Sequence, residues 1–387
     1  MHIFFSVGEP SGDQHAAHLI HELKRVQPDI RCSGFGGPLL EQAGCRLLFR
    51  MTNLAVMGIV AVIPLLGKFY RLLQQAQSFF HEARPDAVVL IDFPGFNWWI
   101  ARKAKAAGIP VFYYFPPQLW AWAPWRVRKI RKFVDHVLCS LPFEKSWYAE
   151  RGVEAEYVGH PVFDEVAAYP LDEPFCREWS EHENTNVAVL PGSRNREVTA
   201  NWPVMLDVIR RVYSSSPHTR FLIACYKDAH RRWCEAQLTE GDRRLPIYFF
   251  VRKTPEILSV ATCCLMVSGS VSLEVLARSK PAVVIYCVGR PMWLIAHLLL
   301  SCRFLSLPNL MAGRAIMPEF YCAWNRARDI AEITTILTRW LNRPEDLTVT
   351  RAEMTQLRDK IIVPEATQRA ATVILERMHR SPSQRAA

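Results

Sequence analysis

The sequence lacks an apolar run long enough to cross a bilayer. Its longest apolar stretches, 54–66 and 291–302, fall short of the roughly 20 residues that a membrane-spanning helix requires. The first residues, Met1–Val7, are apolar, but they carry no basic segment and meet Glu9 and Asp13 too early for a secretory signal peptide. We therefore expect no transmembrane helix and a chain that stays in the cytosol.

Several catalytic and metal-binding motifs are also absent. The 11 cysteines include no Cys-x-x-Cys pair, and several lie inside apolar runs, which indicates free thiols in a reducing compartment. Neither Gly-x-Ser-x-Gly nor His-Glu-x-x-His occurs, so the simplest serine hydrolase and zinc protease interpretations are excluded. There is no Walker A loop, no complete Gly-x-Gly-x-x-Gly and no Asp-x-Asp pair. We therefore expect no bound metal and no cofactor.

Positive charge is in excess, with a formal net charge of +10. This excess favours anionic partners, but it does not distinguish nucleic acid, phospholipid and phosphorylated small molecules. The chain has 387 residues, of which 50% are hydrophobic, so it can bury a large core and exceeds the usual size of one domain. We expect two domains.

Short runs of β-branched and aromatic residues alternate with segments of helical period, which predicts parallel strands joined by crossover helices. A polar stretch, 171–186, interrupts this alternation. We predict an α/β chain of two doubly wound, Rossmann-like domains facing a cleft: 1–165, a linker at 166–185, and 186–345, with C-terminal helices at 346–380 packing back on the first domain. The predicted strands are Ile3–Val7, Ala87–Ile91, Val111–Phe115, His136–Ser140, Val187–Leu190, Phe221–Cys225, Ile247–Phe250, Cys264–Val267 and Ala282–Tyr286.

A glycine-containing turn, Gly8-Glu9-Pro10-Ser11-Gly12-Asp13, follows the first predicted strand. Its glycines free the backbone, and the next helix presents unpaired N–H groups, so the turn suits a phosphate or a sugar hydroxyl. Turns between strands and helices also need glycine for their geometry alone. We assign Gly8, Ser11 and Gly12 to an acceptor site and keep the purely geometric alternative.

Asp92 follows the predicted strand Ala87–Ile91, where a buried strand reaches the expected cleft. Burial there raises the pKa of a carboxyl group towards the value that a general base needs to take a proton from a sugar hydroxyl. The alternative is that Asp92 or Asn97 caps the next helix.

Two comparable turns occur in the second predicted domain. Pro191-Gly192-Ser193-Arg194 places an arginine at the start of a helix, where it can bind a diphosphate through two hydrogen bonds, unless it is an ordinary surface arginine. Ser268-Gly269-Ser270 precedes Glu274, which would either bind ribose hydroxyls or cap its helix. The predicted nucleotide-binding residues are Gly192, Ser193, Arg194, Ser268, Gly269, Ser270 and Glu274.

Two segments have the composition of a membrane-facing surface. The stretch from Trp120 to Lys132 combines tryptophans with five basic residues in its last seven positions, which suits anionic headgroups, or less well nucleic acid. The apolar segment 54–66 suits acyl chains or a protein core. We predict membrane or acyl contact for Val56, Met57, Val60, Val62, Ile63, Leu65, Leu66, Trp120 and Trp122.

Short motifs spread over nearly the whole chain resemble, in their residues and in their order, the motifs of one protein family. They are Gly8–Asp13, Val56–Val60, Ile91–Asn97, Trp120–Trp122, Leu141–Glu144, Gly159–Pro161, Pro191–Arg194 and Ser306–Arg314. On these motifs the sequence resembles the lipid-A-disaccharide synthases.

The resemblance implies the GT-B fold and an inverting transfer that joins UDP-2,3-diacylglucosamine to 2,3-diacylglucosamine 1-phosphate through a β-1,6 bond, with release of UDP. Asp92 then matches the base proposed to activate the acceptor 6-hydroxyl. Arg194 and Asn309 match residues important for activity in the UDP-binding half, and Glu274 lies in the segment that lines the nucleotide. The family also implies a peripheral enzyme at the cytoplasmic face of a Gram-negative inner membrane, with no nucleic-acid partner. The oligomeric state stays open.

Several positions depart from the pattern common in the family, among them Ser270-Val271-Ser272, which replaces a Gly-Thr-Ala-like turn. Ala61 replaces a glutamate and Pro116 a serine, and both bear on the placement of the acceptor. Cys287 replaces an arginine and Cys322 a glutamine, and both are expected to lie near the donor site.

Two other functions are compatible with the motifs. A UDP-sugar epimerase, or a transferase with another acceptor, would keep the fold, although the apolar segment 54–66 argues against it. A protein that binds sugar nucleotides at a membrane surface without turnover would keep the turns but not the reaction.

Overall fold

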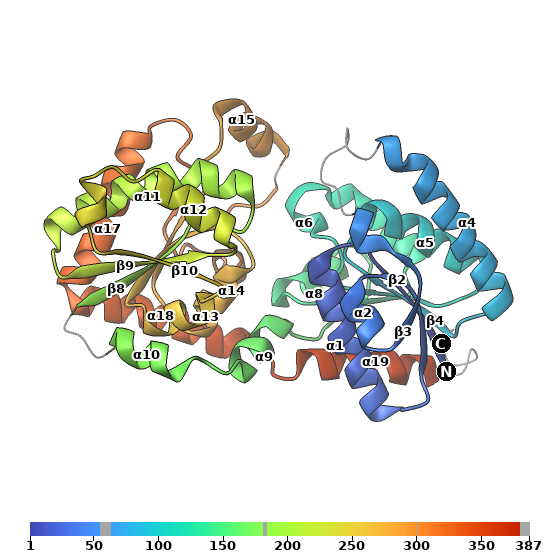
Figure 1. Ribbon diagram of the computed structural model, residues 1–387. Coiled ribbons are helices and arrows are strands. Elements are labelled where there is room, and N and C mark those ends of the chain that lie inside the picture. Colours follow the sequence, from blue (N-terminus) through green and yellow to red (C-terminus); the bar gives the residue numbers. More distant parts are fainter. Residues whose placement is uncertain (55–62, 181–183, 300, 380–387) are drawn as a thin grey trace. The chain divides into compact units, whose positions relative to one another are not determined.

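The computed structural model describes residues 1–54, 63–180, 184–299 and 301–379, which fold into two compact units (Figure 1). Unit 1 comprises Met1–Pro161 together with the described residues from Val363 onward, and unit 2 comprises Val162–Ile362. Among the described helices, none combines the length and the apolar composition that a bilayer crossing requires.

The sheet of unit 1 has seven strands in the order β3-β2-β1-β4-β5-β6-β7, and all neighbouring strands are parallel. The strands are β1 (His2–Val7), β2 (Arg31–Gly36), β3 (Cys45–Arg50), β4 (Ala87–Ile91), β5 (Val111–Tyr114), β6 (His136–Cys139) and β7 (Ala155–Tyr157). The helices are α1 (Pro10–Val26), α2 (Pro38–Gln42), α4 (Leu66–Ala83), α5 (Pro94–Ala106), α6 (Leu119–Trp122), α7 (Val127–Phe133), α8 (Pro142–Ala149) and α19 (Ala366–His379). Helix α9 (Pro161–Ala168) contains the boundary with unit 2.

Alternation along the central strand β1 gives unit 1 two core layers, because successive side chains of a strand point to opposite faces of the sheet. Ile3, Phe5 and Val7 lie in one layer, together with buried residues of α1 and α19. Phe4 lies in the other layer, where its ring contacts Phe80 of α4 edge-on at 4.9 Å. Both faces of the sheet are therefore covered, as a fully buried parallel sheet requires.

The C-terminal helix α19 lies beside α1 (Figure 1). Its residues Ala370, Ala371, Ile374 and Leu375 are buried in the same layer as Ile3. The sequence predicted that helices within 346–380 pack on the first domain. Helix α19 does, whereas α18 (Pro344–Ile361) packs within unit 2.

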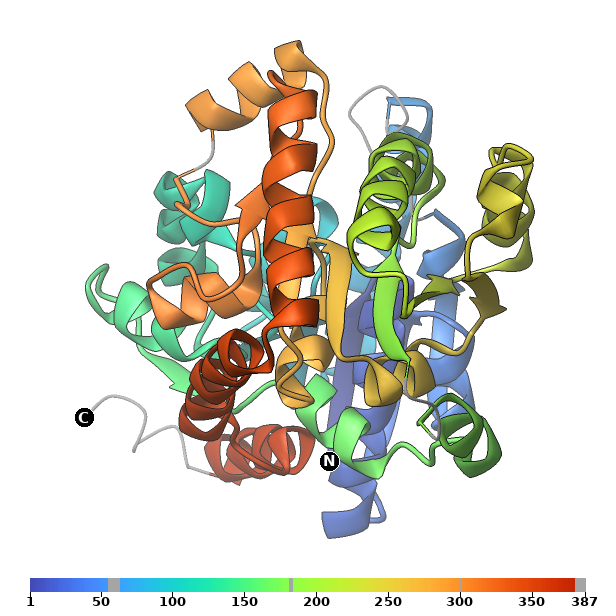
Figure 2. The same ribbon diagram turned by 90° about the vertical axis from the view of Figure 1, so that its left-hand side faces the viewer.

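The sheet of unit 2 has six parallel strands in the order β10-β9-β8-β11-β12-β13. Helices α11 and α17 lie side by side on one face (Figure 2). The buried Trp202 of α11 belongs to the same core layer as Ile333 and Leu337 of α17. The strands are β8 (Thr185–Leu190), β9 (Thr219–Cys225), β10 (Ile247–Val251), β11 (Cys263–Val267), β12 (Ala282–Ile285) and β13 (Glu319–Phe320). The helices, besides α18, are α10 (Glu173–Ser180), α11 (Asn195–Ser215), α12 (Asp228–Ala236), α13 (Thr254–Val260), α14 (Val271–Ala277), α15 (Arg290–Leu299), α16 (Leu307–Ala312) and α17 (Arg326–Asn342).

The segment predicted as a linker, 166–185, instead carries α10 as a packed part of unit 2. Trp179 is buried and meets Phe250 at 5.4 Å, and its carbonyl oxygen accepts a hydrogen bond from Arg220. Two aromatic residues in a polar stretch, Phe175 and Trp179, are enough to fix the helix, so the composition alone was misleading. The chain crosses between the units at Pro161–Val162 and at Ile362–Val363.

The two doubly wound, Rossmann-like domains predicted from the sequence are confirmed. Each of the nine predicted strands is present to within two residues at either end. The prediction omitted β2, β3, β7 and β13, of which β7 and β13 have only three and two residues.

We expect Ile374→Ala in α19 to destabilise unit 1 by about 2–5 kcal/mol, because it leaves a cavity in a fully buried layer. Amide hydrogen exchange should accelerate in β1 and stay unchanged in β8 of unit 2. The exposed Glu376→Ala on the same helix is the control and should change stability by less than about 0.5 kcal/mol. Unchanged exchange in β1 would show that unit 1 does not depend on α19.

Candidate active site

In unit 1 the turns that follow β1 and β4 lie next to each other, because these strands are adjacent and parallel. The strand order reverses at this point, and open α/β sheets bind ligands at the carboxyl edge where that happens. A Cβ atom on Gly8 would lie 2.2 Å from the ring of Phe93, and one on Gly12 would lie 3.3 Å from Oδ2 of Asp92. The glycines therefore allow the first turn to approach Asp92 closely.

The backbone of Asp92 is held in an uncommon conformation. Asp92 and Phe93 both have left-handed φ angles, 47° and 44°, which non-glycine residues adopt only when their surroundings impose it. The carbonyl oxygen of Asp92 accepts hydrogen bonds from Nδ2 of Asn97 and from the hydroxyl of Tyr113, both at 2.8 Å. Ser6 of β1 in turn donates to Oδ1 of Asn97 at 2.6 Å. These bonds fix the backbone of Asp92 and leave its carboxylate available.

The pKa of Asp92 lies in the range that suits a general base. Burial, followed by the negative charge of Glu9, raises the pKa of Asp92 to about 7. The residue nevertheless keeps some exposure, so a ligand can reach it. No side chain caps α5 in the described structure, and the amide of Asn97 binds carbonyl groups instead of helix N–H groups, so the capping alternative is wrong.

The acidic residue of the first turn, Asp13, has a structural role. Its buried carboxylate accepts hydrogen bonds from the backbone N–H groups of Gly37, Leu39 and Leu40 at 2.7, 2.9 and 3.2 Å. It thereby joins the start of α1 to the start of α2.

Two histidines lie near this turn, and both pack against Phe115. The ring centroids of His15 and His160 are 4.7 and 5.5 Å from that of Phe115. Burial lowers the pKa of His15 to about 4 and that of His160 to about 3, so both are neutral at physiological pH. Across the ranges that the structure describes, no three His, Cys, Asp or Glu side chains are grouped to hold a metal ion.

In unit 2 the turns that follow β8 and β11 line one pocket of about 440 Å³, again where the strand order reverses. This pocket brings together six of the seven residues that the turns predicted for nucleotide binding. Arg194, the seventh, does not line it, and neither does Asn309, which the resemblance added. The six are Gly192, Ser193, Ser268, Gly269, Ser270 and Glu274.

The turn after β8 forms a cradle of N–H groups, and the carboxylate of Glu197 occupies it. Oε2 of Glu197 accepts hydrogen bonds from the backbone N–H groups of Ser193 and Arg194 at 3.0 and 3.1 Å. Oε1 accepts one from the guanidinium of Arg194 at 2.9 Å. Gly192 allows this approach, because a Cβ atom there would lie 2.6 Å from Cβ of Glu197. The side chain of Arg194 is 63% exposed.

Glu274 lines the pocket, and burial raises its pKa while Arg278 opposes the shift. In the described structure no side chain caps α14, so the capping alternative for Glu274 is wrong.

Asn309 is fully buried and pins a neighbouring segment. Its Nδ2 donates to the carbonyl of Met317 and to Glu319, both at 2.7 Å, and its Oδ1 accepts from the N–H groups of Ile316 and Met317. Ser268 of the pocket donates to the carbonyl of Leu305 at 2.8 Å, and the N–H group of Leu305 donates to Glu319 at 2.7 Å. Asn309 does not line the pocket but is connected to it through Glu319 and Leu305.

The residues of this pocket that sequence reasoning missed include, besides Glu197, the polar side chains of Tyr169, Tyr226, Arg252 and Thr254. They stand alone in the sequence rather than in motifs. Their position in the chain could have indicated two of them, since Tyr226 and Arg252 directly follow the strands β9 and β10. Arg252 is exposed and has a left-handed φ of 57°.

The cysteines that depart from the family pattern lie in the core of unit 2, away from this pocket. Cys287 and Cys322 are both buried in this core. The N–H group of Cys287 donates to Asn201 at 2.8 Å. Pro116 is buried in unit 1, and Ala61 lies outside the described residues.

An apolar cavity of about 550 Å³ lies between α4 and α5 of unit 1. Leu66, Phe69, Tyr70 and Trp99 line it, and Arg102 and Lys103 lie at it as well. Tyr70 and Trp99 are 63% and 52% exposed.

The residues predicted to contact a membrane have different environments. Trp122 is exposed, and the guanidinium of Arg126 stacks on its ring at 4.4 Å. Leu66 is exposed and Leu65 is half-buried. The prediction for Trp120 is wrong, because its ring is buried and its indole N–H donates to Glu144 at 3.0 Å. Val56, Met57, Val60 and Val62 lie outside the described residues, as does the side chain of Ile63.

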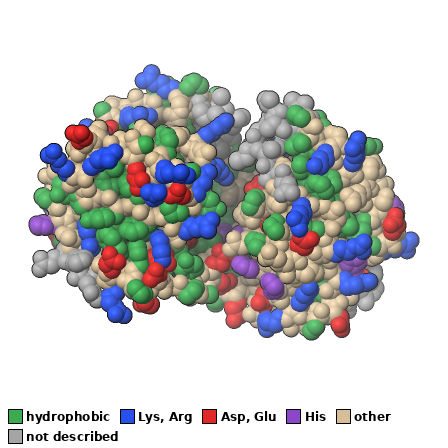
Figure 3. Space-filling model, in the orientation of Figure 1, with side chains coloured by type: hydrophobic (Ala, Val, Ile, Leu, Met, Phe, Trp, Pro, Cys, Tyr) green, Lys and Arg blue, Asp and Glu red, His purple; other side chains and the backbone are tan. Residues whose placement is uncertain are grey.

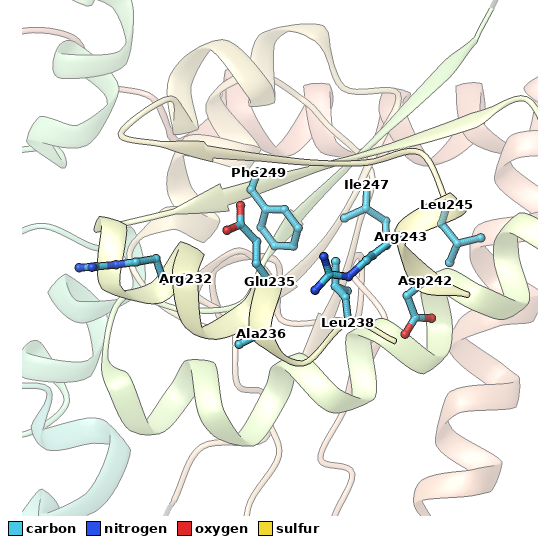
Figure 4. Close-up of a pocket in the computed structure, with 9 residues that line it drawn as sticks. All are labelled: Arg232, Glu235, Ala236, Leu238, Asp242, Arg243, Leu245, Ile247 and Phe249. Carbon is cyan, nitrogen blue, oxygen red and sulfur yellow. The ribbon is translucent and has the colours of Figure 1, made fainter. Parts of the chain in front are cut away.

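A third cavity, of about 480 Å³, lies beside the edge strand β10, and no predicted site residue lines it (Figure 4). Three of its charged side chains are neutralised in ion pairs: Arg232 with Asp228, Glu235 with Arg231 and Asp242 with Arg210. The surrounding face of unit 2 mixes basic, acidic and hydrophobic side chains (Figure 3). Most of its charged lining side chains are therefore already paired within unit 2.

Comparison with known proteins identifies the same family that the sequence motifs resemble. The family model described as lipid-A-disaccharide synthetase matches residues 3–373. The lipid-A-disaccharide synthase of Syntrophus aciditrophicus (strain SB) is 35% identical over 382 residues, with 98% of each chain covered. That of Myxococcus xanthus (strain DK1622) is 36% identical over 318 residues, with 82% of each chain covered.

Solved structures agree on the fold. MurG of Acinetobacter baumannii superposes with a TM-score of 0.62 at 14% identity, covering 97% of this chain and 99% of that one. The UDP-GlcNAc 2-epimerase of Neisseria meningitidis superposes with a TM-score of 0.61 at 11% identity, covering 98% and 99%. Because this fold serves both transferases and epimerases, only the sequence match distinguishes between them. On that match the chain belongs to the lipid-A-disaccharide synthase family, whose members are glycosyltransferases of the GT-B fold.

Proposed function

We propose that this protein transfers 2,3-diacylglucosamine from UDP to the 6-hydroxyl of 2,3-diacylglucosamine 1-phosphate, forming a β-1,6 bond with inversion and releasing UDP. The observation that carries this proposal is Asp92, an accessible carboxylate with a pKa of about 7 at the strand-order reversal of unit 1. The pocket of unit 2, at its own reversal, offers the N–H groups and hydroxyls that a nucleotide diphosphate requires. The names of the relatives support the choice of substrates.

In the proposed reaction the carboxylate of Asp92 accepts the proton of the acceptor 6-hydroxyl while that oxygen attacks C1 of the donor sugar. The bond between C1 and the diphosphate oxygen breaks, and its electron pair leaves with UDP. The N–H groups of Ser193 and Arg194 and the guanidinium of Arg194 stabilise the charge on the leaving diphosphate. Glu274 binds the ribose hydroxyls. We propose that these groups suffice without a metal ion, since the sequence has no Asp-x-Asp pair.

We also propose that unit 1 works at an anionic membrane surface as a peripheral protein. Exposed aromatic residues, Trp122 and Trp125, adjoin the basic helix α7, and tryptophan and clustered cations both favour such interfaces. The apolar cavity between α4 and α5 is suited to an acyl chain.

We expect Asp92→Asn to lower kcat by about 10²–10⁴-fold, because the amide keeps the shape of the side chain but cannot accept the proton. Purified protein would be given both lipid substrates in buffer with EDTA, and the disaccharide 1-phosphate would be followed by mass spectrometry. Asp86→Asn, at the opposite end of β4, is the matched control and should keep nearly full activity. An Asp92→Asn protein that folds and retains wild-type kcat would remove Asp92 from the mechanism.

The pH profile provides a separate test of the base. Below pH about 7 the carboxyl of Asp92 is protonated, so kcat/KM should fall tenfold per pH unit. Glu9→Gln removes a negative charge that disfavours the ionised form of Asp92, so it lowers the pKa and shifts this acidic limb to lower pH. Glu82→Gln, at the far end of α4, should leave the limb in place. If the acidic limb of the kcat/KM profile lies at the same pH in Glu9→Gln as in the wild type, the assignment of this limb to Asp92 is wrong.

Membrane binding depends on α7 if the proposal holds. Arg128→Gln/Lys132→Gln should weaken binding to vesicles rich in phosphatidylglycerol by about 30-fold, since each cation near the surface contributes about 1 kcal/mol. Co-sedimentation measures this, and vesicles of neutral lipid should show no difference. Arg232→Gln/Arg243→Gln removes the same charge from unit 2 as the matched control. Equal losses in the two double variants would show that only net charge matters.

A further inference from the structure

The cradle of N–H groups after β8 already holds an anion, which is the carboxylate of Glu197. This carboxylate forms three hydrogen bonds with two residues of the turn, at 3.0, 3.1 and 2.9 Å. Backbone N–H groups at the start of a helix bind phosphate through the same positions and the same electrostatics. A carboxylate and a phosphate oxygen therefore cannot occupy these two N–H groups together.

The cradle opens into the nucleotide pocket. Gly192, Ser193 and Glu197 all line this pocket of about 440 Å³, so a ligand inside it reaches the carboxylate. Arg194, in contrast, does not line the pocket while its guanidinium is paired with Glu197. The pairing thus withdraws the arginine that the sequence places at a diphosphate.

We propose that Glu197 is an internal competitor of the donor diphosphate. On binding, the diphosphate displaces the Glu197 carboxylate from the N–H groups of Ser193 and Arg194, and the guanidinium of Arg194 is released to join the diphosphate. Glu197 is a positioning residue: it keeps the cradle ordered without donor and sets donor affinity. This inference deepens the proposed function and rests on it for the identity of the donor.

The exchange is favourable because the incoming group is the stronger partner. A diphosphate carries more charge and more acceptor oxygens than one carboxylate, and its bonds to a guanidinium are bidentate and charge-assisted. The pair that it replaces is a partly exposed ion pair, whose net stabilisation is small.

Titration calorimetry with UDP and with inorganic pyrophosphate tests the exchange. Glu197→Gln weakens the competitor and frees Arg194, so the Kd of both ligands should fall about three- to tenfold. Arg194→Gln should raise both Kd values. Glu332→Gln, which breaks a similar pair with Arg328 on α17, is the matched control and should bind both ligands like the wild type. In the transferase assay, Glu197→Gln should lower KM for the donor without raising kcat.

A purely structural capping role makes the opposite prediction. It predicts that Glu197→Gln binds UDP and pyrophosphate as the wild type does or more weakly, and that result at an unchanged melting temperature would overturn the proposal. Where the variant does not fold, a crystal structure of the wild type with UDP decides. Glu197 away from both N–H groups supports the exchange, and phosphate bound beside an unmoved Glu197 overturns it.

These readouts are separate from the proposed function. Binding of UDP and pyrophosphate requires no transfer, so a protein without transferase activity still tests the exchange. If the wild type is an active transferase but Glu197→Gln binds UDP no more tightly than the wild type does, the proposed function stands. The proposed displacement of Glu197 is then wrong.

Discussion

The chemistry of each unit depends on the point where the order of its parallel strands reverses. In unit 1 the chain builds outward from β1 through β2 and β3 and then returns to β4 on the other side of β1; unit 2 repeats this with β8 and β11. The hydrogen-bond register aligns the carboxyl ends of each central pair, Val7 with Ile91 and Leu190 with Met266. The helices that leave these strands diverge to opposite faces, so their first turns surround an open position. Asp92 and the Glu197 cradle both lie at such positions.

At Asp92 the backbone has the structural role and the carboxylate has the chemical one. Asn97 and Tyr113 bind the carbonyl oxygen, and the two left-handed residues direct the chain into α5. None of these contacts uses the carboxylate, whose pKa depends on burial and on Glu9. Because the backbone strain is offset by hydrogen bonds from Asn97 of α5 and Tyr113 of β5, the side chain does not have to stabilise the turn. It can therefore change protonation state without loosening the site.

The sequence predicted the parts of the fold and site that depend on local pattern. Central strands such as β4 are continuous apolar runs between helical segments, and the turns after them are recognisable motifs. Strand β2, Arg31–Gly36, contains two glycines and was not predicted as a strand, because its pairing with β1 is a tertiary effect. Trp120 and Trp122 are indistinguishable in sequence, yet only Trp120 has a buried carboxylate partner, Glu144. The bond between Arg194 and Glu197 was missed because charge pattern does not reveal which anion occupies a helix start.

Asp13 and Glu197 are two of the carboxylates that bind backbone N–H groups, and they differ in what can replace them. Asp13 accepts from three N–H groups and is almost fully buried between two helices, so no solute can compete for its partners. Glu197 accepts from two N–H groups, and its side chain keeps 13% exposure at the wall of a pocket. The same interaction is permanent where burial excludes competitors and exchangeable where a pocket admits them. Burial, more than the capping motif, thus decides which carboxylate stabilises the fold and which gives way to a ligand.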